Sequence, residues 1–194
     1  ARAKAYADLI FSGSETMMTD LIGAMEGGIV EDSVTPLYLR PAAILVRPGN
    51  PQQINGIRDL LRPGRRVIVV NGAGQNGLWE DVVGRLADIE AVRAFRRNIV
   101  TQARNSAEAR QRWIDDPTIE AWLIWNIWQV ANPQLADAVP VEPDLVTYRD
   151  TGIGLTRRGA DNVAARRFVE FLLSDRGAGI FRRWGWVDRV SPPR

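Results

Sequence analysis

The amino-acid sequence predicts an α/β fold with mostly parallel sheets. Short apolar or β-branched runs alternate with segments of helical periodicity nearly throughout the chain, which is typical of strands connected by helices. The length of 194 residues is enough for one large core or for two small lobes. Two segments are expected crossings between lobes, namely residues 47–50, which carry a strong turn signal, and residues 147–151. We therefore expect residues 47–148 to form one lobe, and residues 1–46 together with 149–194 to form the other.

Glycine and proline residues mark the ends of the expected elements in the first half of the chain. Pro41 is expected to break an apolar segment at residues 37–46, because proline cannot donate a hydrogen bond to a neighbouring strand. Hydrophobic periodicity predicts the remaining elements of this half, which are strands at 7–11 and 66–70 and helices at 16–25 and 57–61.

The second half alternates between helices and strands, and residues 120–125 fit either a strand or the start of a buried helix. The other expected elements are helices at 78–86, 88–97, 106–115, 126–132, 161–174 and 177–184, and strands at 98–102, 138–141, 145–148 and 153–155. The last two helices are amphipathic. The residues expected on their buried face are Phe168, Phe171, Leu172, Ile180 and Phe181.

The composition excludes several classes of catalytic site. The chain has no histidine and no cysteine, so zinc sites built on these residues and Ser-His-Asp or Cys-His centres are excluded. The 25 basic residues are nearly all arginine, but 23 acidic residues are interspersed with them, which argues against nucleic acid as a partner. Arginine is well shaped for bidentate binding of carboxylate, phosphate or sulfate. The sequence thus favours a binding protein over an enzyme, with no cofactor or metal.

The most specific local motif is the turn Gly72-Ala73-Gly74-Gln75-Asn76-Gly77. It follows a strand, precedes a helix and fits the dinucleotide fingerprint G-x-G-x-x-G. The acidic residue expected at the end of the next strand is absent, however, and Leu78 and Trp79 stand where a Walker loop needs lysine and serine or threonine. Backbone N–H groups at a helix N-terminus bind anions. The turn therefore predicts an anion site with free N–H groups at residues 73–75, with a plain turn or a dinucleotide site as alternatives.

Polar residues also follow two other expected strands. Ser12 and Ser14, with Glu15, precede a helix, where they would either cap it or hold anionic oxygens. Asn105 and Ser106 repeat this arrangement after a later strand. In open α/β sheets, ligands bind beyond the carboxyl ends of the strands. Together, these junctions predict a ligand site.

Arg40 lies within an apolar segment, where a charge needs a partner. That partner is either a ligand or a structural carboxylate. Four tryptophans either line a cleft or belong to the core, namely Trp79, Trp122, Trp125 and Trp128.

Six ordered motifs resemble one family over nearly the whole chain. They are ADLIFSGSE, PLYLRPAAIL, NGAGQNGLWEDVVGR, FRRNIV with NSAEAR, AWLIW and WGW. The family is that of the periplasmic binding proteins of the accessory colonization factor C / PEB3 type, which are relatives of the molybdate- and sulfate-binding proteins of ABC transporters.

The resemblance implies a two-lobed type II periplasmic-binding-protein fold, with mixed sheets flanked by helices. It implies an extracytoplasmic solute-binding protein that holds a small oxyanion, or a phosphorylated or carboxylic acid, in the cleft between the lobes. A membrane permease of an ABC transporter would be a partner, and some members form homodimers. The junctions and the resemblance together predict these ligand-binding residues: Ser12, Ser14, Glu15, Arg40, Gly72, Ala73, Gly74, Gln75, Asn105 and Ser106.

The resemblance also implies a periplasmic location, although no signal peptide is visible in the chain. Family members begin with a strand that carries a glycine-rich turn, then a helix and a second strand, before the segment that matches Ala7. We therefore expect the first lobe to be N-terminally incomplete. Two other functions stay open, namely an NAD(P)-binding oxidoreductase that uses the Gly72–Gly77 turn, and a surface adhesin or antigen without a role in transport.

Overall fold

The computed structural model describes residues 6–72 and 74–189, so the predicted site residue Ala73 lies outside the described residues. The chain divides into two units. One holds the described residues up to Leu39 and from Arg149 onward, and the other holds Arg40–Tyr148. The first boundary falls within strand β2 (Thr35–Val46), earlier than the expected crossing at residues 47–50, so Arg40 belongs to the second unit.

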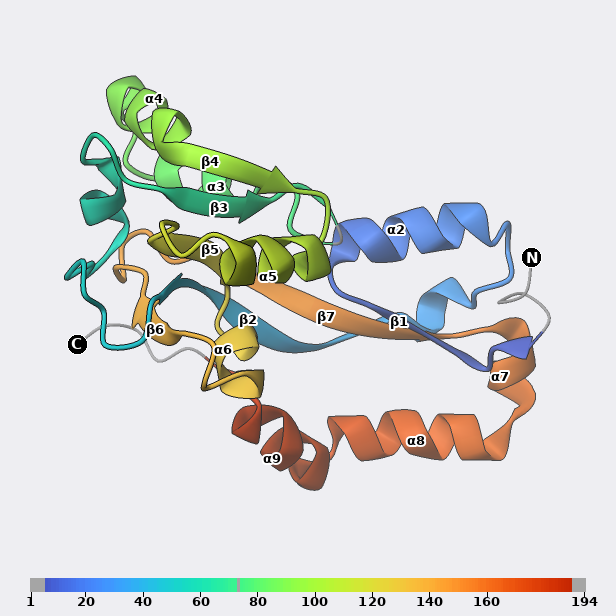
Figure 1. The fold of residues 1–194 in the computed structure, drawn as a ribbon. Coiled ribbons are helices and arrows are strands. Elements are labelled where there is room, and N and C mark those ends of the chain that lie inside the picture. Colours follow the sequence, from blue (N-terminus) through green and yellow to red (C-terminus); the bar gives the residue numbers. More distant parts are fainter. Residues whose placement is uncertain (1–5, 73, 190–194) are drawn as a thin grey trace. The chain divides into compact units, whose positions relative to one another are not determined.

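The first unit is built around an antiparallel pair of strands, β1 (Leu9–Ser12) and β7 (Tyr148–Leu155), in which Ser12 lies opposite Gly152. In Figure 1, α2 lies on one side of this pair and α8 on the other. The helices of the unit are α2 (Glu15–Ala24), η1 (Glu31–Ser33), α7 (Arg157–Asp161), α8 (Val163–Leu173) and α9 (Asp175–Arg183). A small core beneath α2 contains Ile10, Met18, Met25 and Ile29.

The helix predicted at 161–174 is present as α8, which the side chain of Asn162 starts by accepting a hydrogen bond from the Ala164 N–H, whereas the short helix α7 before it was not predicted. Two other expectations were wrong. Leu145 of the second unit was expected in a strand but lies in a turn closed by its N–H on the Glu142 carbonyl, and the strand starts only at Tyr148. Phe168 was expected to be buried but is 48% exposed.

The second unit has strands in the order β6-β2-β5-β3-β4, and Figure 1 shows β4, β3, β5 and β2 one after another. β3 pairs in parallel with β4 and β5, whereas β2 pairs antiparallel with β5 and β6. The sheet is therefore mixed, and the prediction of mostly parallel strands holds only around β3. The other elements of the unit are η2 (Ile57–Leu61), β3 (Val67–Val70), α3 (Leu78–Gly84), α4 (Ile89–Asn98), β4 (Ile99–Ala103), α5 (Ser106–Asp115), β5 (Ala121–Trp125), α6 (Ile127–Ala131) and β6 (Asp137–Pro140).

Pro41 does not break β2, contrary to the prediction. Proline removes only the N–H donor of its residue, and its carbonyl still accepts a hydrogen bond from the Asn126 N–H at 3.1 Å. Ala42, the next residue, pairs with Trp125 of β5, so the ladder continues without interruption. This pairing also resolves residues 121–125 as a strand.

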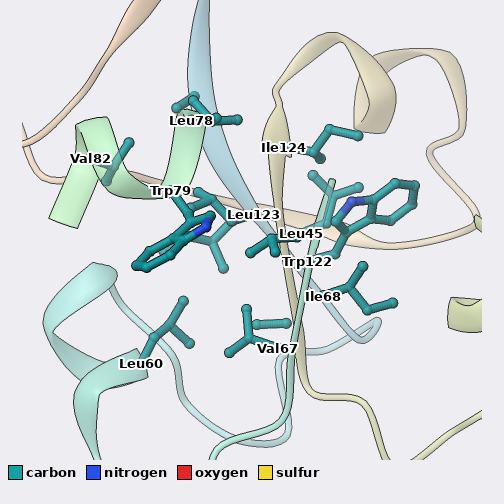
Figure 2. Close-up of a cluster of buried hydrophobic side chains, with 14 of the residues drawn as sticks. Leu45, Leu60, Val67, Ile68, Leu78, Trp79, Val82, Trp122, Leu123 and Ile124 are labelled. Carbon is teal, nitrogen blue, oxygen red and sulfur yellow. The ribbon is translucent and has the colours of Figure 1, made fainter. Parts of the chain in front are cut away.

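The core of the second unit holds most of the tryptophans. Val67 and Ile68 of β3 and Trp122 of β5 are fully buried, and Figure 2 shows side chains from β3, α3 and β5 gathered there. Trp79 at the start of α3 stacks on Phe95 with ring centroids 5.6 Å apart. Burial of each large apolar side chain contributes about 1.5–3 kcal/mol. This packing holds the ends of β3 and α3, and therefore the glycine turn between them, in place.

Candidate functional site

In the second unit, three strand ends meet at one edge of the sheet. Because β3 is parallel to both β4 and β5, the residues after each strand emerge at the same edge. The glycine turn follows β3, and the Asn105-Ser106 junction follows β4. A hydrogen bond of 2.7 Å from the Gln75 Nε2 to the Ser106 Oγ joins these two predicted site segments directly.

The turn needs glycine at Gly72. This residue has a φ of 152°, and a Cβ there would overlap the backbone carbonyl oxygen of Arg104. Gly74 and Gly77 also have positive φ values, 77° and 74°, which favour glycine. Close packing therefore explains the glycine at position 72, and backbone conformation explains those at positions 74 and 77, whatever the turn binds.

The prediction of a free backbone N–H at Gln75 was wrong. This N–H donates to the Gly72 carbonyl at 3.0 Å, and the Gln75 carbonyl accepts from the Leu78 N–H at 3.1 Å. The turn therefore satisfies these groups internally, as tight turns do. What it offers at Gln75 is the side chain, which is 3% exposed and whose Oε1 has no hydrogen-bond partner among the described residues.

Asn105 and Ser106 have different positions at the start of α5. The Asn105 Oδ1 accepts from the Glu108 N–H at 2.9 Å, so of the two residues that the sequence offered as N-cap, Asn105 or Ser106, Asn105 is the one that caps the helix. The Glu108 carboxylate accepts from the Arg104 N–H and Nε, and the hydrogen bond from the Arg104 side chain lowers the pKa of Glu108. Asn105 therefore has a structural role, whereas the Ser106 side chain contacts the glycine turn.

Arg40 reaches the same edge because β2 runs antiparallel to β5. The Arg40 side chain is 8% exposed, and its guanidinium carbon lies 4.9 Å from the ring centroid of Trp125, the last residue of β5. A guanidinium over an indole face is stabilised by the ring quadrupole. Thr147 is also buried. It lies near Arg40 because its carbonyl accepts a hydrogen bond of 2.9 Å from the N–H of Ala42, two residues further along β2. The Thr147 hydroxyl has no partner among the residues described, and no sequence motif singled this residue out.

In the first unit, Ser12 and Ser14 flank the start of α2. The Ser14 Oγ accepts from the Met17 N–H at 3.2 Å and caps the helix. Ser12 is 1% exposed, and its Oγ has no hydrogen-bond partner among the described residues. The first-turn N–H groups of a ten-residue helix have no acceptor within the helix. A buried hydroxyl and a helix N-terminus together form a suitable set of donors for an anion.

Two carboxyl groups accompany this donor set. Glu15 is the first residue of α2, and its pKa is raised from 4.5, first by partial burial and then by the nearby Asp150 carboxylate. Asp150 precedes Thr151, whose hydroxyl donates to the Ser12 carbonyl at 2.5 Å. Sequence reasoning missed Asp150, because only the pairing of β1 with β7 brings it near Glu15. Within the described ranges, no group of three or more carboxylates could hold a metal ion.

Each unit thus brings together part of the predicted residue set. The first unit gathers Ser12, Ser14 and Glu15, and the second places Arg40, Gly72, Gly74, Gln75, Asn105 and Ser106 at one sheet edge. The groups are mainly hydroxyls, amides and a guanidinium, which complement the oxygens of an anion.

Comparison with solved structures shows strong likeness to PEB3. PEB3 from Campylobacter jejuni is 32% identical, with a TM-score of 0.88 over 97% of this chain and 82% of that one. L-phospholactate-bound PEB3 gives a TM-score of 0.89 at the same identity and coverage. The sulfate-binding protein SubI from Mycobacterium tuberculosis H37Rv is 18% identical, with a TM-score of 0.76 over 95% of this chain and 71% of that one. No curated protein sequence matches.

These likenesses show that the chain has the type II periplasmic-binding-protein fold. Within the described residues, no helix has the length and apolar character needed to cross a bilayer. The family model of the bacterial extracellular solute-binding proteins matches residues 1–187. The chain therefore belongs to the family of bacterial extracellular solute-binding proteins.

Proposed function

We propose that this protein is the periplasmic solute-binding protein of an ABC-type transporter and that it binds a small oxyanion or a phosphorylated or carboxylic acid. The observation that carries the proposal is Ser12. Its hydroxyl is buried beside the N-terminus of α2 and lacks a hydrogen-bond partner among the described residues. A buried hydroxyl without a partner costs about 1–3 kcal/mol, which a ligand oxygen would offset.

The second unit supports the same class of ligand. Arg40 is buried, and burial of a guanidinium is favourable only when acceptors or an aromatic face compensate for lost water. Arg40, Gln75 and Ser106 supply a charge, an amide and a hydroxyl at the edge where ligands bind in open α/β sheets. PEB3, at 32% identity, is similar to this chain and binds L-phospholactate, which carries a phosphate and a carboxylate.

The dinucleotide alternative has less support. The Gln75 N–H is used within the turn, and α3, which follows it, has only seven residues. Neither the family model nor the reported structures describe a dinucleotide-binding protein. An adhesin or antigen role would use the same fold, and a variant that does not bind anions yet still supports attachment to host cells would favour it.

The test is calorimetric titration of the protein with sulfate, molybdate, phospholactate, phosphoglycerate and citrate. We expect at least one of them to bind, and Arg40→Met to weaken that binding by at least about 30-fold, as for a buried charged contact. Arg40→Lys keeps the charge but loses the planar fork, so a smaller loss is expected. Arg97→Met, at an exposed arginine of the same unit, is the control and should leave affinity unchanged. The proposal fails if none of the five anions binds.

The membrane partner and the assembly state follow from this proposal. A permease that accepts the solute is the expected partner, and reconstituted transport that depends on the protein would test it. A homodimer is a separate prediction, which the mass in solution from light scattering checks.

A further inference from the structure

One buried hydrogen-bond acceptor of the second unit lacks a donor. Gln75 is 3% exposed, and its Oε1 has no partner among the described residues. The amide nitrogen of the same side chain donates to the Ser106 Oγ at 2.7 Å, which sets the orientation of the amide. A carboxamide oxygen accepts hydrogen bonds but cannot donate them, and burying it unpaired is unfavourable. The group that completes its hydrogen bonding must therefore be a donor.

The unpartnered hydroxyls of Ser12 and Thr147 set no such requirement. A hydroxyl can donate as well as accept, so an oxygen of any oxyanion satisfies it. An ionised oxygen beside the Gln75 Oε1 would instead bring two acceptors together with no proton between them. Of these three side chains, only Gln75 thus distinguishes between anions that carry an O–H group and anions that do not.

The Gln75 amide lies beside the N-terminus of α5. Ser106 is the first residue of this ten-residue helix, and Asn105 caps the Glu108 N–H, whereas the N–H groups of Ser106 and Ala107 have no acceptor within the helix. Such N–H groups bind anions. The oxygen and nitrogen of a carboxamide are about 2.2 Å apart, so the Gln75 Oε1 lies within about 5 Å of the Ser106 Oγ. A ligand that accepts from the Ser106 hydroxyl is therefore close enough to donate to Gln75.

We propose that Gln75 selects a ligand that carries an O–H group beside its anionic oxygens, either the hydroxyl of a protonated phosphate or an alcohol next to a phosphate or carboxylate. This inference rests on the proposed function and narrows its ligand class. The Gln75 Oε1 accepts from the ligand O–H, while the Ser106 hydroxyl and the N-terminus of α5 donate to the anionic oxygens. Sulfate and molybdate have no O–H at neutral pH, so they leave the Oε1 unpaired and bind more weakly.

The experiment compares two pairs of anions by titration calorimetry on the full chain. At about pH 8, hydrogen phosphate and sulfate have the same charge and tetrahedral shape, and only hydrogen phosphate carries a proton. The second pair, 2-phosphoglycerate and phospholactate, differs by one alcohol hydroxyl. We expect the O–H member of at least one pair to bind at least about tenfold more tightly. A preference within the first pair identifies a protonated phosphate, and one within the second pair identifies an alcohol.

Gln75→Met removes the acceptor with little change in side-chain volume. It should bring the ratio of the two dissociation constants close to one, mainly by weakening the O–H member. This ratio does not depend on the folded fraction, so it stays informative where the variant is less stable. Gln111→Met, at an exposed glutamine of α5, is the matched control and should keep the ratio of the wild type.

Three results overturn the inference and leave the proposed function intact, because anions still bind the wild type. They are a ratio near one for both pairs, a preference for sulfate or phospholactate, and a Gln75→Met variant that keeps the preference or weakens both members equally. Failure of all these anions, and of molybdate and citrate, to bind the wild type overturns the proposed function instead.

Discussion

At the scale of single residues, Gly72 shows how a backbone position constrains a candidate site. Its φ of 152° and the closeness of the Arg104 carbonyl both exclude a side chain. The close approach ties the end of β3 to the end of β4, and Gln75 and Ser106 lie in the segments that follow these two strands. The geometry of the sheet edge therefore depends on this one glycine.

Gly72→Ala is expected to destabilise the protein by about 2 kcal/mol or more, because the new Cβ forces the two strand ends apart. Gly64→Ala is the matched control. Gly64 also has a positive φ, 85°, but open space surrounds its Cβ position, so about 1 kcal/mol is expected. Urea denaturation of both variants measures the difference, and equal losses would mean that contact with Arg104 has no role.

The motif around Gly72 predicted a turn between a strand and a helix, and the structure has one there. The pattern could not reveal how the turn uses its hydrogen bonds. The Gln75 N–H points back to the Gly72 carbonyl, which depends on dihedral angles that a motif does not specify. Asp150 and Thr147 were also beyond prediction, since each lies near the site only through strand pairing.

At the scale of elements, two helices of the first unit begin in the same way. Ser14 caps α2 through the Met17 N–H at 3.2 Å, and Ser174 caps α9 through the Gly177 N–H at 3.3 Å. Of these two helix starts, only that of α2 has next to it a buried hydroxyl that lacks a partner within the described part of the chain. The pair thus separates the structural role of a cap from a role in binding.

Ser14→Ala and Ser174→Ala should each lower the free energy of unfolding by about 1 kcal/mol, as loss of a serine cap does. Only Ser14→Ala should also weaken binding of the anion that titration identifies. Chemical denaturation and calorimetry on both variants check this. A loss of affinity that is equal for the two would show that the effect comes from stability alone.

Several elements could be predicted because their signals are local. The helix at 106–115 was predicted with the bounds of α5, and residue type narrowed its cap to Asn105 or Ser106, of which the structure has Asn105. Pro41 was misjudged, since the effect of a missing N–H depends on whether a neighbour needs it. The exposure of Phe168 was misjudged because amphipathic spacing shows which face is apolar but not what covers that face.

At the scale of the whole molecule, the resolved pKa shifts differ between the units. In the second unit, hydrogen bonds lower the pKa values of three carboxylates. Arg104 donates to Glu108, Thr118 donates to Asp116, and Arg58 donates to Asp144. In the first unit, the pKa of Glu15 is raised by partial burial and by Asp150. Acid should therefore act on the two units in opposite senses.

The three carboxylates of the second unit contribute stability above their ordinary pKa values, 3.8 for aspartate and 4.5 for glutamate, and lose it as pH falls through their folded-state values. Acidification from about pH 7 to pH 3 should thus lower the urea midpoint of the second unit. Fluorescence of its buried Trp122 and Trp125 reports that midpoint. Arg58→Gln, which removes the partner of Asp144, should reduce the pH dependence, and an unchanged dependence would contradict this assignment.

The sequence by itself determined the α/β class, the positions of the strand-to-helix junctions, the caps and the family. These depend on periodicity and on residue types within a few positions of each other. Only the tertiary structure decided that the sheet is mixed, that Arg40 lies over Trp125 in the second unit, and that Asp150 accompanies Glu15. Each of these depends on strand register between segments far apart in the chain, where the partner of a residue is set by packing rather than by local pattern.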